Sequence, residues 1–230
     1  MNCNRKRIGL VGGISWVSTM EYYRYINEGV NQKLGGLHAA ECVIYSLNFG
    51  DVQERGWEDS YELLLNACNS LKDANVDAIA LCANTAHLFA DRLQEAVGVP
   101  IISIIIETAR AVSNLGLHTV GLLGTRYTME MDFYRKKLES YGLKVLIPEK
   151  QETRDYIQRT LRDELGIGQI NPATKEAYIN IGGELIDAGA ECILLGCTEI
   201  PLLIGPDDFS VPVLDTTQIH SKSIVECMVS

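Results

Sequence analysis

The sequence has few basic residues and no apolar run long enough to cross a membrane. Its 230 residues include 20 Lys and Arg against 30 Asp and Glu, which gives a formal net charge of −10 at pH 7. A transmembrane helix needs about 20 consecutive, mostly apolar residues, and no stretch of this chain approaches that length. The acidic balance disfavours nucleic acids and anionic membranes as partners, because both are negatively charged. A small anionic substrate is still compatible with it, since a few local donors can outweigh the net charge.

Signals for export, metal binding and nucleotide binding are also missing. Three glycines interrupt the apolar stretch of the opening MNCNRKRIGLVGG, so we expect no signal peptide and a cytoplasmic protein with reduced thiols. The seven cysteines are an odd number in a chain too long to be a disulfide-stapled miniprotein. No two of them have C-x2-C spacing, and Cys82 with His87 lacks the spacing of zinc ligands, so we expect no metal site. GLVGGIS does not follow the G-x-G-x-x-G pattern of dinucleotide-binding turns.

What the chain does contain is an alternation of short aliphatic runs with longer amphipathic stretches. Runs that are apolar throughout and separated by helices are typical of parallel sheets that helices cover on both faces, so we predict an α/β fold. The predicted strands lie within residues 7–13, 40–47, 76–82, 99–105, 118–125, 142–148, 190–197 and 211–217, and two of the helices span 15–34 and 60–74.

The two halves of the chain repeat this scheme in register. Gly9 in IGLVGG and Gly121 in VGLLGT are 112 residues apart, and so are Pro100 in VPIIS and Pro212 in VPVLD. We interpret this match as a duplication that gives two similar α/β units with equivalent turns after their strands.

The duplication predicts a first lobe at 1–105, completed by 206–230, and a second lobe at 106–205. Ligands of open parallel sheets bind at the carboxyl ends of the strands. Two lobes that face each other would therefore place one cleft between two near-equivalent turns.

Two turns carry the residues best suited to chemistry. LCANTAH at 81–87 and LGCTEIP at 195–201 each end a predicted strand, open a predicted helix and contain a cysteine. A thiol in this position lies near unpaired backbone N–H groups and the positive end of the helix dipole, which lowers its pKa. The same N–H groups suit a carboxylate, and Asn84, Thr85 and Thr198 add side-chain donors or helix caps.

Such a pair of turns suits the inversion of a carbon beside a carboxylate. One group must remove the proton from one face, and a second group must deliver a proton to the opposite face. A thiol on each lobe would supply both groups.

Three stretches of the chain resemble the cofactor-independent aspartate/glutamate racemase superfamily. They are GLVGGISWVSTMEYYRYINEGVNQKLGGLHAAE near the start, ANTAH at 83–87 and GCTEIPLL at 196–203. The first is most similar to the broad-specificity amino-acid racemase branch. The resemblance implies two pseudo-symmetric Rossmann-like lobes with the active site in the cleft between them, no cofactor such as pyridoxal phosphate, and a homodimer.

The resemblance also assigns roles to residues of this chain. Cys197 corresponds to the catalytic thiol of the second lobe. The positions that bind the substrate are Ile14 and Ser15 in the first turn, Ala83, Asn84 and Thr85 in its neighbour, and Thr125 and Thr198 in the second lobe. Glu199 either polarises the thiol or favours the helix N-terminus through its charge. In the loop after the second strand, Gln53 or Arg55 could contact a distal carboxylate, for which a bidentate arginine is the suitable clamp.

The thiol of the first lobe is where the chain departs from the family. In members with two thiols the cysteine directly precedes Asn-Thr, and here Ala83 occupies that position. Cys82 comes one residue earlier, and neighbouring residues of a strand point to opposite faces. We therefore expect Cys82 to be a buried structural thiol, with a catalytic role as the alternative.

Three functions remain open at this point. The first is an amino-acid racemase or epimerase, with aspartate or glutamate as the first guess. The second is a decarboxylase of the same superfamily, because one thiol suffices to protonate a carbanion. The third is a non-catalytic protein that binds a carboxylate in the same cleft. All three predict a small-molecule partner and neither a nucleic acid nor a membrane.

Overall fold

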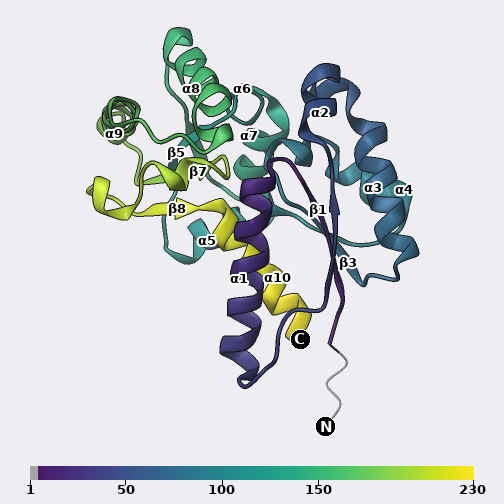
Figure 1. The fold of residues 1–230 in the computed structure, drawn as a ribbon. Coiled ribbons are helices and arrows are strands. Elements are labelled where there is room, and N and C mark those ends of the chain that lie inside the picture. Colours follow the sequence, from purple (N-terminus) through teal and green to yellow (C-terminus); the bar gives the residue numbers. More distant parts are fainter. Residues whose placement is uncertain (1–4) are drawn as a thin grey trace. The chain divides into compact units, whose positions relative to one another are not determined.

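The computed structural model describes residues 5–230 and divides into two compact units. The first unit comprises the chain up to Ile104 together with Thr217–Ser230, and the second comprises Ile105–Thr216. Each unit has one four-stranded parallel sheet with helices around it (Figure 1). No helix among the described residues is long and apolar enough to span a membrane.

The sheet of the first unit has the strand order β2-β1-β3-β4. Its strands are β1 (Ile8–Gly12), β2 (Cys42–Ser46), β3 (Ala78–Leu81) and β4 (Ile101–Ile102). The helices and 3-10 turns of this unit are α1 (Trp16–Leu34), α2 (Phe49–Arg55), η1 (Trp57–Asp59), α3 (Tyr61–Asp73), η2 (Thr85–Phe89), α4 (Ala90–Val97) and α10 (Thr216–Val229).

The sheet of the second unit has the order β6-β5-β7-β8, which repeats the topology of the first. Its strands are β5 (Thr119–Gly124), β6 (Lys144–Leu146), β7 (Cys192–Gly196) and β8 (Val213–Asp215). Its helices and 3-10 turns are α5 (Ile104–Asn114), α6 (Arg126–Glu130), α7 (Asp132–Glu139), α8 (Gln151–Asp163), η3 (Leu165–Ile167), α9 (Pro172–Asp187), η4 (Ile200–Leu202) and η5 (Pro206–Asp208). The predicted α/β fold with two similar sheets is confirmed.

The chain returns to the first unit later than the sequence suggested. We expected 206–230 to complete the first lobe, but β8 pairs in parallel with β7, with Leu195 opposite Asp215. Residues 206–216 therefore belong to the second unit, and only α10 after Thr216 belongs to the first. The reason is that VPVLD continues the second sheet as its edge strand, which is the equivalent of β4 in the first sheet.

The core of the first unit follows from the alternation of side chains along its buried strands. Helices α1 and α10 cover one face of the sheet together, and α3 covers the other, where Leu71 packs against Gly9 (Figure 1). The residues that form the core on the face of α1 and α10 are Ile8, Leu10, Ala78, Ala80 and Cys82 from the sheet, Tyr22, Ile26 and Val30 from α1, and Ile224, Val225 and Met228 from α10.

Candidate active site

The turn after β1 is shaped by a glycine and by the start of α1. Gly13 has φ +83, and a Cβ atom at this position would lie 2.1 Å from the carbonyl oxygen of Leu47, so only glycine fits. Its N–H donates to Oγ1 of Thr19 at 2.8 Å. The side chain of Ser15 then caps the nineteen-residue α1 by accepting from the Ser18 N–H. Ile14 and Ser15 are thus held, almost fully buried, at the carboxyl edge of the sheet.

The second turn of the first unit lies beside this one. The Cys82 N–H donates to the carbonyl oxygen of Val11 at 2.9 Å, which keeps β3 in register with β1 up to the turn. Asn84 and Thr85 follow directly and are each 3% exposed. Four of the predicted binding residues therefore gather at one edge of one sheet, the edge where ligands of parallel sheets bind.

Cys82 points away from that edge and into the core. Its side chain is fully buried on the same face as Ala78 and Ala80, and its thiol lies 3.9 Å from the Ala80 carbonyl oxygen. Burial raises the pKa of Cys82 far above the usual range of a thiol. The burial expected from the register is therefore present, and buried thiols of this kind are generally unreactive, but the structural role of Cys82 stays a prediction. Ala83, which precedes Asn84, is 6% exposed.

The equivalent turns of the second unit also lie side by side. Gly124 at the end of β5 is opposite Gly196 at the end of β7. Thr125 and Cys197 therefore directly follow neighbouring strands at the same edge of the sheet. Its hydroxyl oxygen accepts from the Thr128 N–H at 3.2 Å and so caps α6.

Cys197 is in contact with a buried carboxylate. Its S–H donates to Oε2 of Glu199 at 3.0 Å, and the Thr198 hydroxyl donates to the same oxygen at 3.0 Å. The side chain of Cys197 is partly exposed, whereas Glu199 is only 8% exposed. The three residues thus form one hydrogen-bonded group at the end of β7.

The pKa of Cys197 is raised well above its usual value, contrary to our expectation for a thiol at the end of a strand. The removal of water by the surrounding protein is the largest cause, followed by the charge of Glu199 and its hydrogen bond to the thiol. Backbone N–H groups of Thr198 and Glu199 act in the opposite direction and are outweighed. The expected helix is only η4, which has three residues, so little dipole acts on the sulfur. Cys197 is therefore a neutral thiol at rest.

Tyr178 of α9 is a neighbour of Cys197 that the sequence did not indicate. Its hydroxyl forms a hydrogen bond with the Thr160 hydroxyl at 3.0 Å and also lies 3.3 Å from the carbonyl oxygen of Ile157. Burial raises its pKa strongly, and the nearby Cys197 adds to the rise. A tyrosine in the middle of a helix carries no motif, so only the packing of α8 against α9 identifies it.

The structure places Gln53 and Arg55 on α2, which follows β2 at the same carboxyl edge of the first sheet. Both side chains are exposed, and Val52 anchors the helix in the core. Their contact with a substrate remains a prediction.

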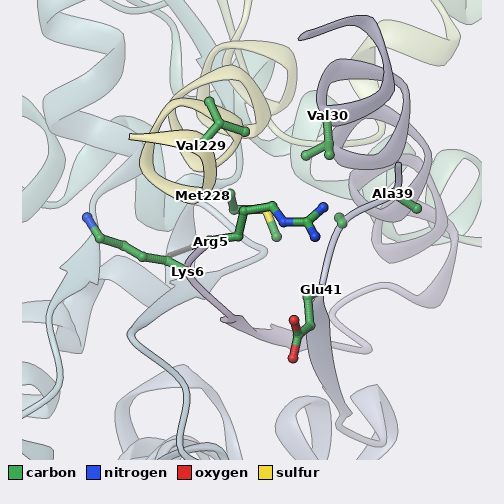
Figure 2. Close-up of a pocket in the computed structure, with 8 residues that line it drawn as sticks. Arg5, Lys6, Val30, Ala39, Glu41, Met228 and Val229 are labelled. Carbon is green, nitrogen blue, oxygen red and sulfur yellow. The ribbon is translucent and has the colours of Figure 1, made fainter. Parts of the chain in front are cut away.

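A cavity of about 250 Å³ lies at the other end of this sheet, where β1 begins and α10 ends (Figure 2). It contains no thiol and none of the predicted site residues. Its lining residues are Arg5, Lys6, Val30, Ala39, Ala40, Glu41, Met228 and Val229. Within the described part of the chain, no group of three or more His, Cys, Asp or Glu residues could hold a metal ion.

Residues 11–224 of the chain match the Asp/Glu/Hydantoin racemase family. The chain belongs to this family. Its relatives include the broad specificity amino-acid racemase RacX of Bacillus subtilis (strain 168), which is 26% identical over 170 residues that cover 73% of this chain and 72% of the relative. A solved structure from Yersinia pestis, assigned to the Asp/Glu racemases, superposes with a TM-score of 0.90 at 40% identity and covers 98% of this chain and 100% of that chain.

An aspartate racemase homologue from Pyrococcus horikoshii OT3 superposes with a TM-score of 0.84 at 37% identity over 98% of this chain and 100% of that chain. These matches confirm the predicted family, its two-lobe α/β fold and the assignment of the chain to the racemases, which are isomerases.

Proposed function

We propose that the protein is a cofactor-independent amino-acid racemase or epimerase, with aspartate or glutamate as the first candidate substrates, in which Cys197 transfers the α-proton. The observation that carries the proposal is the contact of the Cys197 thiol with the buried carboxylate of Glu199. The similarity of the chain to RacX and to an aspartate racemase homologue supports an amino acid as the substrate.

In this proposal, turns at the carboxyl ends of the strands bind the substrate. Asn84, Thr85 and Thr198 bind the α-carboxylate, because side-chain donors and backbone N–H groups at strand ends favour a negative charge. Ile14, Ser15 and Thr125 are the other proposed contacts of the substrate. Cys197 then approaches the α-carbon from one face.

Glu199 allows Cys197 to act both as the base that removes the α-proton and as the acid that returns it. When the thiol proton passes to Glu199, the resulting thiolate accepts the α-proton, and the bonding electrons stay on the substrate as a carbanion conjugated with its carboxylate. In the reverse step, the thiol returns a proton to the carbon and recovers one from Glu199. A positioned acid or base of this kind accelerates proton transfer by roughly 10²–10⁴-fold.

The opposite face of the substrate requires a different group, since the methyl side chain of Ala83 cannot transfer a proton. A water molecule oriented by the Thr85 hydroxyl, two residues further in the same turn, is our candidate. A hydroxyl is a far weaker acid than a thiol. We therefore expect exchange of the α-hydrogen on the face of Cys197 to be faster than inversion.

The proposal is tested by incubating each enantiomer of aspartate and glutamate with the protein in heavy water. Proton NMR measures α-deuteration, and chiral chromatography measures inversion. The wild type should deuterate at least one of them, Cys197→Ser should lose the exchange, and Cys227→Ser, which alters a partly exposed thiol on α10, should retain it. If neither these nor any other amino acid is deuterated, the proposal is wrong, and binding of aspartate without exchange would indicate a carboxylate-binding protein.

A decarboxylase is the second candidate, and it is favoured because the chain keeps Cys197 but has Ala83 where the second thiol would stand. Loss of carbon dioxide from a malonate-type acid leaves a carbanion without any base, and a single thiol then protonates it. Release of carbon dioxide that depends on Cys197, in the absence of α-deuteration of amino acids, would support this activity.

We also propose that the protein is cytoplasmic and forms a homodimer. Trp16, Met20 and Tyr23 of α1 are 65%, 60% and 51% exposed and follow one another at helical spacing. Exposed apolar stripes of this kind are typical of interaction surfaces. A Met20→Glu variant should run as a monomer in size-exclusion chromatography with light scattering, and a wild type that is itself monomeric would contradict the proposal.

A further inference from the structure

Two histidines and a tyrosine form a buried cluster behind the Ala83-Asn84-Thr85 turn. His87 and His220 are 5% and 0% exposed, and their rings meet edge-on with centroids 5.8 Å apart. His220 on α10 also contacts the Tyr22 hydroxyl of α1 through Nδ1 at 2.9 Å. All three residues belong to the first unit.

The partners of His87 determine its tautomer. The N–H of Ile104 donates to Nε2 at 3.1 Å, so this nitrogen carries no hydrogen. Nδ1 lies 2.9 Å from the Ala83 carbonyl oxygen, which can only accept, so Nδ1 carries the hydrogen and donates it. The ring thus ties the carbonyl of the candidate turn to the first N–H of α5, a group that a helix leaves without an internal partner.

His220 is fixed in the opposite tautomer. Its Nε2 lies 2.8 Å from the carbonyl oxygen of Ile102 and must donate to it. Its Nδ1 therefore accepts the hydroxyl hydrogen of Tyr22. Each ring is held at both nitrogens, so neither can rotate without breaking a hydrogen bond.

Both rings stay neutral at physiological pH. Burial lowers the pKa of His87 to about 4, against hydrogen bonds and the charge of Asp91 on α4 that act to raise it. Burial and the neighbouring His87 lower the pKa of His220 to about 3, and the group that faces it from α1 is the uncharged Tyr22 hydroxyl.

We propose that His87 is a positioning residue for substrate binding, which fixes the backbone of Ala83, Asn84 and Thr85 by donating from Nδ1 to the Ala83 carbonyl. The inference rests on the proposed function for the role of Asn84 and Thr85 as carboxylate donors. The hydrogen bond sets the orientation of the peptide that leads into Asn84. His220 packs edge-on against the ring of His87, and Tyr22 in turn holds His220.

Two substitutions of His87 separate its two hydrogen bonds. In His87→Asn, the shorter amide side chain presents its N–H₂ group near the place of Nδ1 and keeps the donor to the Ala83 carbonyl. In His87→Gln, the longer side chain presents its amide oxygen near the place of Nε2 and keeps the acceptor for the Ile104 N–H. His38→Asn, which alters an exposed histidine, is the control.

We expect His87→Gln to raise the KM for the amino acid about tenfold, the effect of one lost buried hydrogen bond, with a smaller change in kcat. His87→Asn should keep the wild-type KM although it lowers the melting temperature by breaking the bond to Ile104. Equal KM values for the two variants, or a KM that follows the melting temperature, would overturn the inference.

A second measurement does not depend on activity. In the nitrogen-15 NMR spectrum of the protein without substrate, His87→Gln should shift the backbone amides of Asn84 and Thr85, and His87→Asn should leave them in place. Long-range correlations should show the wild-type His87 protonated on Nδ1. The opposite tautomer, or equal shifts in both variants, would overturn the inference, whereas a wild type without α-deuteration but with this pattern would contradict only the proposed function.

Discussion

The Sγ atom of Cys197 lies 3.0 Å from Oε2 of Glu199, and the Thr198 hydroxyl donates to the same carboxylate oxygen. The negative charge and the hydrogen bond both hold the proton on the sulfur. A thiol held in this way can donate a proton at once. It becomes a base only when the carboxylate takes the proton from it.

Replacing Glu199 by glutamine should separate these two effects. The pKa of Cys197 should fall because the charge of Glu199 is gone, and the ultraviolet absorbance of the thiolate should therefore appear at a lower pH than in the wild type. The α-deuteration rate should nevertheless fall, by about 10²-fold, because glutamine cannot accept the proton. Glu184→Gln, which alters an exposed residue of α9, should leave both properties unchanged. A Glu199→Gln protein that exchanges faster than the wild type would show that the carboxylate only suppresses the thiolate.

Cys82 and Ala83 allow a matched test of the first-unit turn. Cys82→Ser places a hydroxyl in the core and should lower the free energy of unfolding by roughly 1–3 kcal/mol, with the exchange rate of the folded protein unchanged. Ala83→Cys places a thiol at the position of the second acid or base and should raise inversion relative to α-deuteration. Urea unfolding and the ratio of inverted to retained deuterated product measure the two effects. Loss of exchange in a folded Cys82→Ser protein would contradict the structural role of this thiol.

The register of Cys82 and Ala83 could be predicted because it needs only the alternation of a single strand. Side chains alternate along β3, so Ala78 and Ala80 share one face, and Cys82, which directly follows the strand, shares it too. The duplication could also be predicted, because glycine and proline positions recur at the same spacing in the two halves of the chain. The two sheets indeed have the same strand order.

Other features depend on contacts between distant parts of the chain. The point at which the chain leaves the second sheet, after β8 and before α10, has no signal of its own in VPVLDTT. The raised pKa of Cys197 results from burial and from the direction of the Glu199 side chain, and neither is a property of the motif GCTEI. The contact between His87 and His220 joins residues 133 positions apart and has no local signal.

Arg55 offers a test of substrate choice. It is the last residue of α2, is exposed, and lies beyond the carboxyl end of β2. If it clamps the distal carboxylate, Arg55→Gln should raise the KM for aspartate or glutamate about tenfold or more, because a charged hydrogen bond is lost, and should leave the KM for a neutral amino acid unchanged. Gln53→Ala should have a smaller effect. Equal effects on acidic and neutral substrates in steady-state kinetics would remove Arg55 from the site.

The buried histidines predict how stability depends on pH. The pKa of His87 falls from 6.5 to about 4 and that of His220 to about 3 on folding. Below pH 6.5 the unfolded chain therefore binds more protons than the folded protein. The contribution of these two histidines to the free energy of unfolding is therefore fully present above pH 6.5. It is lost as the pH falls towards 4 for His87 and towards 3 for His220. Each pKa unit corresponds to about 1.4 kcal/mol, so one such histidine should lower the free energy of unfolding by roughly 2 kcal/mol between about pH 7 and pH 5.

Urea unfolding across this interval isolates the two residues, because carboxylates titrate mainly at lower pH. The double variant His87→Asn/His220→Gln should be less stable at neutral pH and should lose most of the dependence on pH, whereas His38→Asn should keep the wild-type slope. If the free energy of unfolding of the double variant depended on pH as strongly as that of the wild type, the rings would already be charged or accessible in the folded protein. In that case the tautomers that hold the Ala83 carbonyl could not persist at neutral pH.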